Sequence, residues 1–249
     1  MTVRDDDSVL TRAVAAPDLT VAYASAAEQV ADIRYGGEGA DRRPLVLLVH
    51  GGFWRPAYDR SHAGPMSQAL ASAGWTVATI EYRRVPGKPD LTLQDVRRAV
   101  EALPALTNRH NGNRVLVGHS AGGQLVLWAG ATATGLPIKG VLALAPAADL
   151  ELSHERGLGD GAVHAFLGAD PRARADVDPR RLPRPQAAVT IVHGVRDDIV
   201  PLEISRSYVA VHRDARLVEL PDAGHFAVID PLSAAWQTVL TELTRLSRD

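Results

Sequence analysis

The chain has 249 residues, of which 46% are hydrophobic, and a formal net charge of −2 at pH 7; this predicts one sizeable core and a single domain spanning 1–249. A net charge this close to zero gives the protein no strong positive potential of the kind that attracts nucleic acid or an anionic membrane surface. It favours a small-molecule partner instead. The chain contains no cysteine, which excludes disulfides, a thiolate zinc site and a cysteine nucleophile.

The N-terminal stretch MTVRDDDSVL bears on location. It carries three aspartates where a secretory signal peptide would have positive charge followed by an apolar run. No apolar stretch of 18 residues, enough to span a bilayer, occurs in the sequence. These features predict a cytoplasmic protein.

Apolar runs of strand length alternate with longer stretches of helical period. DLTVAYAS (18–25) and QVADIRYG (29–36) are typical of paired strands, and PLVLLVHGG (44–52) is typical of a buried parallel strand. Further strands are expected at 76–84, 114–118, 140–147, 187–194 and 215–220, and helices at 61–74, 91–106, 121–132, 201–212 and 232–246. This alternation predicts an α/β fold, with a mostly parallel central sheet flanked by helices on both faces.

One segment, from about Asp149 to Pro185, breaks the alternation. It is rich in Arg, Asp, Pro and Gly, and has one helix-like piece, DGAVHAFLG (160–168). Segments this long inside a compact domain are usually lids or binding insertions. We expect a lid-like insertion that builds much of the substrate pocket.

Ser120 lies at the junction of a predicted strand and helix, in the sequence GHSAGG. Ligands bind at the carboxyl ends of the strands in such sheets, and G-x-S-x-G is typical of a serine presented on a sharp strand-to-helix turn. Gly118 and Gly122 suit this turn because side chains there would collide with neighbouring backbone. A serine that only caps the following helix would have the same surroundings, so the motif alone leaves both interpretations open.

Two later strand ends supply the partners that a serine nucleophile needs, namely a base and a carboxylate that orients it. Asp197 and Asp198 follow one predicted strand, and His225 follows the next. Ser, Asp, His is the chain order of one known class of such triads. We therefore expect Ser120 and His225 to act with one of the two aspartates.

The loop HGGFW follows the third predicted strand. Glycine there lets the backbone approach a substrate closely, and hydrolases place an N–H group of the oxyanion hole in this loop. We expect the N–H groups of Gly51, Gly52 and Ala121 to form the hole, in which loss of one donor typically costs about 100- to 1000-fold in rate.

Phe53 and Trp54 come directly after these glycines and are the candidate substrate-binding residues. Large aromatics near a loop are as often plain core, so this assignment has an alternative. His50 and His193 are expected to hold loops by hydrogen bonds. Because no histidine has the spacing of a zinc site such as H-E-x-x-H, we expect neither a metal ion nor a cofactor.

From about Leu45 to Ala227 the sequence resembles the α/β hydrolases, and within them the kynurenine formamidases (arylformamidases) and esterases with an H-G-G-x-W loop. The resemblance rests on HGGFW, on GHSAGG, and on EYRRVP followed by LQDVRRAV. It implies an α/β-hydrolase fold and a structural role for Asp95. It also implies that Asp197, in H-G-x-x-D, is the triad acid. Phe53 stands where lipase-like loops have a third glycine, which favours the formamidase or small-ester branch.

The residues and the resemblance together predict a serine hydrolase that transfers an acyl group to water. The expected reaction is aryl formamide hydrolysis, N-formylkynurenine to kynurenine and formate, in tryptophan catabolism. The alternative is a carboxylesterase acting on short-chain acyl esters, and a non-catalytic hydrolase scaffold that only binds a ligand is the remote alternative. A homodimer is compatible with the sequence.

Overall fold

The computed structural model describes residues 6–248, so half of the N-terminal stretch used above to predict location lies outside the described residues. Its central sheet has the strand order β1-β2-β4-β3-β5-β6-β7-β8. β2 pairs antiparallel with β1 and β4, and every other pair is parallel, which confirms the mostly parallel sheet. The strands are β1 (Leu19–Ala22), β2 (Val30–Arg34), β3 (Leu45–Val49), β4 (Val77–Ile80), β5 (Arg114–His119), β6 (Ile138–Leu144), β7 (Ala188–Gly194) and β8 (Arg216–Leu220).

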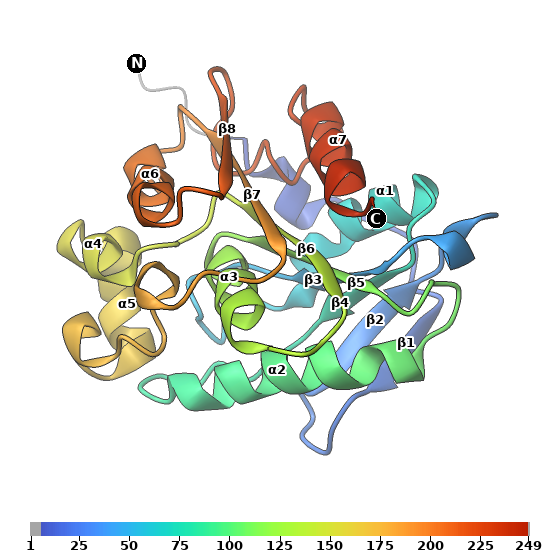
Figure 1. The fold of residues 1–249 in the computed structure, drawn as a ribbon, viewed down its shortest axis with the longest axis horizontal. Helices are drawn as coiled ribbons and strands as arrows, with labels where there is room; N and C mark the ends of the chain where they lie inside the picture. The colour runs from blue at the N-terminus through green and yellow to red at the C-terminus, as the bar shows by residue number, and fades with distance from the viewer. Residues whose placement is uncertain (1–5, 249) are drawn as a thin grey trace.

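Helices cover both faces of this sheet (Figure 1). On one face lie α1 (Gly64–Ser72) and α7 (Trp236–Leu246), which share a buried apolar cluster with the strands. On the other lie α2 (Pro89–Leu106), α3 (Ala121–Thr132) and α6 (Leu202–Val211), which share a second cluster. The fully buried pattern of β3, β4 and β5 follows from this double cover.

Two helices begin later than their sequence pattern predicts. The turn expected to open a helix at residue 61 is the 3₁₀ helix η3 (Arg60–Ala63), capped by the side chain of Asp59, and α1 follows it. The closing helix starts at Trp236 because Asp230 holds the preceding residues in a turn, accepting bonds from the N–H groups of Leu232 and Ser233. Two further 3₁₀ helices are η1 (Ser8–Thr11) and η2 (Ala40–Arg42). No helix within residues 6–248 is long and apolar enough to cross a membrane.

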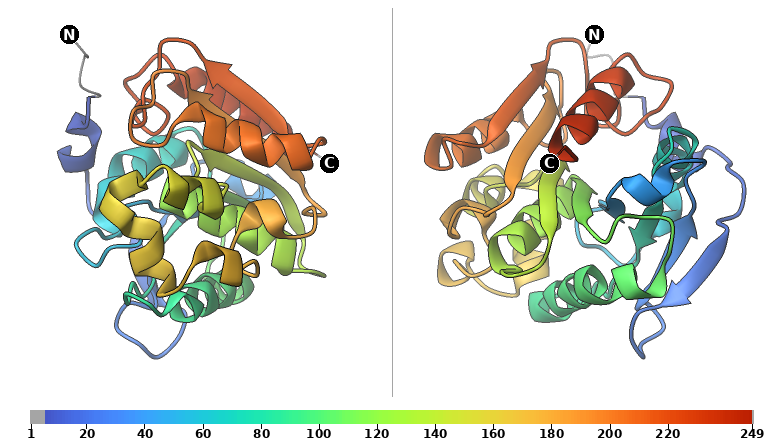
Figure 2. Two further views of the ribbon diagram at one scale, coloured as in Figure 1. Left: turned by 90° about the vertical axis from the view of Figure 1, so that its left-hand side faces the viewer. Right: turned by 45° about the vertical axis from the view of Figure 1, so that its right-hand side comes forward.

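The insertion, residues 149–185, is folded rather than loop-like. It contains α4 (Leu150–Glu155), α5 (Leu158–Leu167), η4 (Pro171–Ala173) and η5 (Pro179–Arg181). Of the helix predicted at 160–168, residues 162–167 are helical, because Gly159, Asp160 and Gly161 have positive φ and kink α5. The helix α4 was not predicted. These helices lie beyond the carboxyl end of β6 and face the viewer in the left panel of Figure 2, in yellow and amber.

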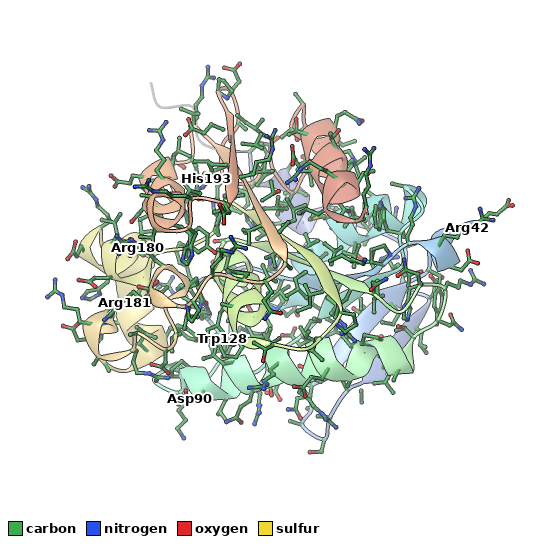
Figure 3. The ribbon with its side chains drawn as sticks, viewed as in Figure 1. Arg42, Asp90, Trp128, Arg180, Arg181 and His193 are labelled. Atoms are coloured by element: carbon green, nitrogen blue, oxygen red, sulfur yellow. The ribbon has the colours of Figure 1, made fainter. Side chains whose placement is uncertain are left out.

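Two side chains of α3 anchor the insertion to the sheet domain. Trp128 Nε1 donates to the carbonyl of Asp176 at 3.0 Å, and Gln124 Nε2 donates to that of Val177 at 2.9 Å. Trp128 and the insertion's Arg180 and Arg181 are labelled in Figure 3. The insertion therefore packs against α3 as a fixed layer.

Asp95 has the structural role that the resemblance implies. It is fully buried. Its carboxylate accepts three hydrogen bonds from Arg83, donated by Nε at 2.8 Å, Nη2 at 2.6 Å and the backbone N at 2.9 Å. Gln29 Nε2 donates to it at 2.6 Å. This paired, hydrogen-bonded charge joins α2 to the chain that leaves β4, just behind the loops at the strand ends.

Candidate active site

Ser120 occupies the sharp turn between β5 and α3. Its backbone has φ 55° and ψ −118°, a conformation that costs a non-glycine residue about 1–3 kcal/mol and is typical of functional sites. The tight packing needs glycines, because a Cβ on Gly118 would lie 2.2 Å from the carbonyl oxygen of Gly122, and one on Gly122 would lie 2.2 Å from that of Val49. The Ser120 side chain makes no capping hydrogen bond to α3, so the helix-cap interpretation is wrong.

The loops after β7 and β8 bring Asp197 and His225 together. His225 Nδ1 lies 2.7 Å from Asp197 Oδ2, and both residues are buried. The other oxygen, Asp197 Oδ1, accepts the N–H groups of Ile199 at 2.9 Å and Val200 at 2.7 Å. Asp198, the competing carboxylate, is exposed.

Hydrogen bonds keep Asp197 ionised. Burial acts to raise the pKa of its carboxyl, but the bonds from His193 and His225 outweigh burial and lower this pKa well below the ordinary value. His193 Nε2 lies 3.1 Å from Asp197 Oδ2 and 2.8 Å from the Val200 carbonyl. His193, labelled at the end of β7 in Figure 3, thus holds this loop as expected.

A cavity of about 700 Å³ opens at these loops. Ser120 and His225 both line it, so the nucleophile and the base of the expected triad face the same space. His119 lines it too, and its ring lies against that of His225 at an interplanar angle of 48°, with centroids 4.5 Å apart. Sequence reasoning assigned His119 no role, because the middle position of G-x-S-x-G carries no pattern of its own.

Two hydrogen bonds orient the glycine loop after β3. The carbonyl of His50 accepts from the Tyr82 hydroxyl at 2.9 Å, and the carbonyl of Gly51 lies 2.8 Å from the Nδ1 atom of His50. In a trans peptide the N–H points opposite to the carbonyl, so the N–H groups of Gly51 and Gly52 point away from these two partners. Neither N–H, nor that of Ala121 at the start of α3, has a hydrogen-bond acceptor within residues 6–248.

This loop also lies close to Ser120. A Cβ on Gly51 would meet Ser120 Cβ at 3.0 Å, and Gly52 lines the cavity with φ +106°. The glycine loop and Ser120 therefore border the same space.

The structure separates the two candidate substrate-binding aromatics. Phe53 lines the cavity as expected. Trp54 does not, because its ring is 4% exposed, stacks on Phe166 with centroids 4.6 Å apart and donates to Gln124 Oε1 at 3.1 Å. Trp54 is therefore a core residue that anchors the glycine loop. The prediction that it binds substrate is wrong, and the alternative that it belongs to the core is confirmed.

The expectation that the insertion builds the pocket is wrong for this cavity, whose lining contains no residue of 149–185 among those described. The insertion instead supports the loop, since Gly159, with φ +58°, packs so closely on Phe53 that a Cβ would lie 2.6 Å from its ring. The part of the cavity wall that was expected from the insertion is formed by η1 and by the segment before η3, including Leu10 and Tyr58. No motif in the sequence pointed to these residues.

No group of three or more His, Asp or Glu side chains within residues 6–248 could hold a metal ion. Beside three separate carboxylates, of Asp7, Asp59 and Asp198, the cavity gathers the Ser120 hydroxyl, imidazoles and the glycine loop. Such a set suits acyl transfer by a nucleophile and a base.

A family model named BD-FAE matches residues 31–210, which is more than two thirds of the chain. The chain belongs to the BD-FAE family. The BD-FAE match runs from β2 into α6 and so includes Ser120 and Asp197, while His225 lies beyond its end.

Two curated relatives accompany this BD-FAE assignment. Esterase LipC of Mycobacterium tuberculosis is 29% identical over 75% of this chain and 54% of its own length. A kynurenine formamidase of Danio rerio is 30% identical over 46% of this chain and 39% of its own length. The chain thus spans about half the length of the first relative and less of the second.

A solved structure gives the fold of this BD-FAE member. Esterase B from Lactobacillus rhamnosis superposes with a TM-score of 0.77 at 19% identity, over 96% of this chain and 89% of that one. The α/β-hydrolase fold is confirmed.

Proposed function

We propose that the protein is a serine hydrolase that cleaves small acyl compounds with Ser120, His225 and Asp197 as its catalytic triad. The observation that carries the proposal is the placement of Ser120, at φ 55°, in the same cavity as His225, whose Nδ1 lies 2.7 Å from Asp197. Serine alone is a weak nucleophile, and an oriented imidazole is what activates it.

In the proposed mechanism, neutral His225 takes the Ser120 proton as the hydroxyl oxygen attacks the substrate carbonyl. Asp197 holds the imidazole in one orientation and stabilises the imidazolium that forms. The N–H groups of Gly52 and Ala121, with that of Gly51 beside them, hold the oxyanion. Protonated His225 then gives its proton to the leaving group, and water repeats the sequence on the acyl-enzyme.

Within this class we rank short acyl esters first. The relative named an esterase matches 75% of the chain, whereas the formamidase of Danio rerio matches 46%. The ranking reverses the expectation of aryl formamide hydrolysis that followed from the sequence resemblance. Formamide hydrolysis remains the second candidate, because two kynurenine formamidases, from Danio rerio and Salmo salar, are similar to this chain at 30% and 34% identity.

The test compares initial rates on p-nitrophenyl acetate and on N-formylkynurenine, with Ser120→Ala as the blank. A higher kcat/KM on the ester supports the first candidate, and a higher value on the formamide supports the second. Absence of Ser120-dependent turnover on both substrates and on a broader panel of esters would contradict the serine mechanism. That result would favour the alternative of a hydrolase scaffold that only binds a ligand.

A further inference from the structure

The cavity at Ser120 has acidic side chains and no basic ones. Asp7, Asp59 and Asp198 line it, whereas no Lys or Arg among residues 6–248 does so. Asp59 accepts bonds from the Ser61 hydroxyl at 2.5 Å and backbone N at 2.8 Å, and these bonds lower the pKa of its carboxyl. The lining is therefore negatively charged at neutral pH.

Nearby arginines are engaged elsewhere. Arg12 comes directly after η1, and its Nη1 atom lies 2.5 Å from Asp230 Oδ1. Arg196, in the loop after β7, pairs with Asp222. Arg55, after the glycine loop, donates to a backbone carbonyl of α5. Each guanidinium thus has an acceptor within the protein, and none of the three arginines lines the cavity.

Two of the three histidines that line the cavity, His62 and His119, do not offset its charge. Burial lowers the pKa of His62 to about 4, and burial lowers the pKa of His119 well below the ordinary value. Both imidazoles are therefore neutral near pH 7. The ring of Tyr58 also lines the cavity, and aromatic faces attract organic cations, most strongly when these are desolvated. Phe53 lines it too, with the guanidinium of Arg55 already 5.7 Å from its ring centroid.

We propose that this cavity selects acyl substrates by charge, favouring neutral and cationic compounds, such as esters that carry a quaternary ammonium group, over compounds that carry a carboxylate. The inference rests on the proposed function, since it takes Ser120 as the nucleophile that the substrate must reach. It deepens that function, because N-formylkynurenine carries, beside its ammonium group, a carboxylate for which the lining offers no Lys or Arg. Aspartates and aromatic rings around a nucleophile both act in the same direction.

The test uses three phenyl acetates that differ only in their para substituent. The substituents are 2-(trimethylammonio)ethyl, propyl and 2-carboxyethyl, which place a positive charge, no charge and a negative charge beyond a two-carbon spacer, so leaving-group reactivity stays similar. Dividing each kcat/KM by the rate of alkaline hydrolysis removes the remaining difference. We expect the cationic ester to exceed the anionic one about tenfold at low salt, and the ratio to shrink at 0.5 M NaCl, because salt screens exposed charges.

Variants locate the source of the preference. Asp198→Asn and Asp7→Asn should each lower the cation-to-anion ratio about two- to threefold, and the double variant should lower it further. Asp41→Asn is the matched control. Asp41 is exposed in η2, just before β3, at the end of the sheet opposite the cavity. Its neighbour Arg42 is labelled far from His193 in Figure 3, so this variant should not change the ratio.

A second matched pair serves the formamide candidate. N-formylkynurenine and its decarboxylated analogue share the scissile formamide and the aryl amine leaving group, and differ in one remote carboxylate. Charge selection predicts a higher kcat/KM for the analogue.

The outcomes are distinguishable. A ratio near one, or a preference for the anionic ester, overturns charge selection if Ser120-dependent hydrolysis of the propyl ester persists, and it leaves the proposed function intact. Absence of Ser120-dependent hydrolysis of all three esters and both formamides overturns the proposed function, and the charge selection that depends on it.

Discussion

The Nε2 atom of His119 lies 3.0 Å from the backbone carbonyl oxygen of His225. A neutral imidazole donates from this nitrogen, and burial, followed by the charge of His225, holds the pKa of His119 well below its ordinary value. His119 therefore stays a neutral donor near pH 7. In the proposed triad, the residue before the nucleophile thus fixes the loop that carries the base.

Replacing His119 tests this positioning role. His119→Leu removes the donor and should lower kcat about two- to tenfold, the range of one hydrogen bond of roughly 0.5–1.5 kcal/mol. His119→Gln places an amide N–H near the same point and should recover most of the loss. Rates are compared with melting temperatures for both variants. Equal kcat losses in both, tracking loss of stability, would contradict positioning and indicate packing alone.

The second prediction separates the two adjacent aspartates. Asp197→Asn should lower kcat about 10³- to 10⁴-fold, because an amide favours the wrong imidazole tautomer and leaves the imidazolium without its counter-charge. Asp198→Asn should change turnover of a neutral ester far less, since Asp198 is exposed and only borders the cavity. Steady-state rates on p-nitrophenyl acetate check both. Similar losses in the two variants would refute the assignment.

The sheet was predictable because burial on both faces gives each strand a continuous apolar run, as in β3 and β5. The common location of the three candidate triad residues was predictable for a related reason. Parallel strands end at one edge, so Ser120, Asp197 and His225, each in a loop or turn that follows a strand, lie at that edge.

The cavity wall was not predictable in the same way. Tyr58 and η1 reach the cavity through tertiary packing of irregular segments, for which sequence has no periodic signal. The prediction that the insertion forms the pocket was wrong for a similar reason. Its length is typical of a lid, but its hydrogen bond with Trp128 holds it as a layer on α3. Sequence periodicity predicts single helices and strands, whereas the cavity lining depends on which segments, distant in the sequence, pack together.

The third prediction concerns the support of the oxyanion loop. Tyr82→Phe removes the hydroxyl that holds the His50 carbonyl, and should lower kcat about tenfold with little change in KM, because loop orientation matters most in the transition state. Tyr23→Phe is the matched control. Tyr23 is also buried and donates to a backbone carbonyl, that of Glu81, at 2.6 Å. Both variants should lose about 1–3 kcal/mol of stability, so an equal loss of kcat would argue against a specific effect on the loop.

The last prediction concerns a buried carboxyl in the insertion. Asp178 is 0% exposed, and burial together with the charge of Asp149 raises its pKa from 3.8 to about 6. Between these two values the native state binds this proton more tightly than the unfolded chain does. The free energy of unfolding contributed by Asp178 therefore falls as the pH rises from about 4 to 6, by at most about 3 kcal/mol.

Asp178→Asn should remove this penalty. The substituted amide keeps an oxygen that can accept the Arg180 N–H, now 3.1 Å from Asp178 Oδ1, and brings no charge near Asp149. We expect the variant to exceed the unmodified protein in stability by about 1–3 kcal/mol at pH 7 and to approach it near pH 4. Asp170→Asn is the matched control, because Asp170 caps the 3₁₀ helix η4 in the same way but is exposed. Urea unfolding from pH 4 to 8 measures the difference, and a pH-independent offset for Asp178→Asn would show that its carboxyl is not the titrating group.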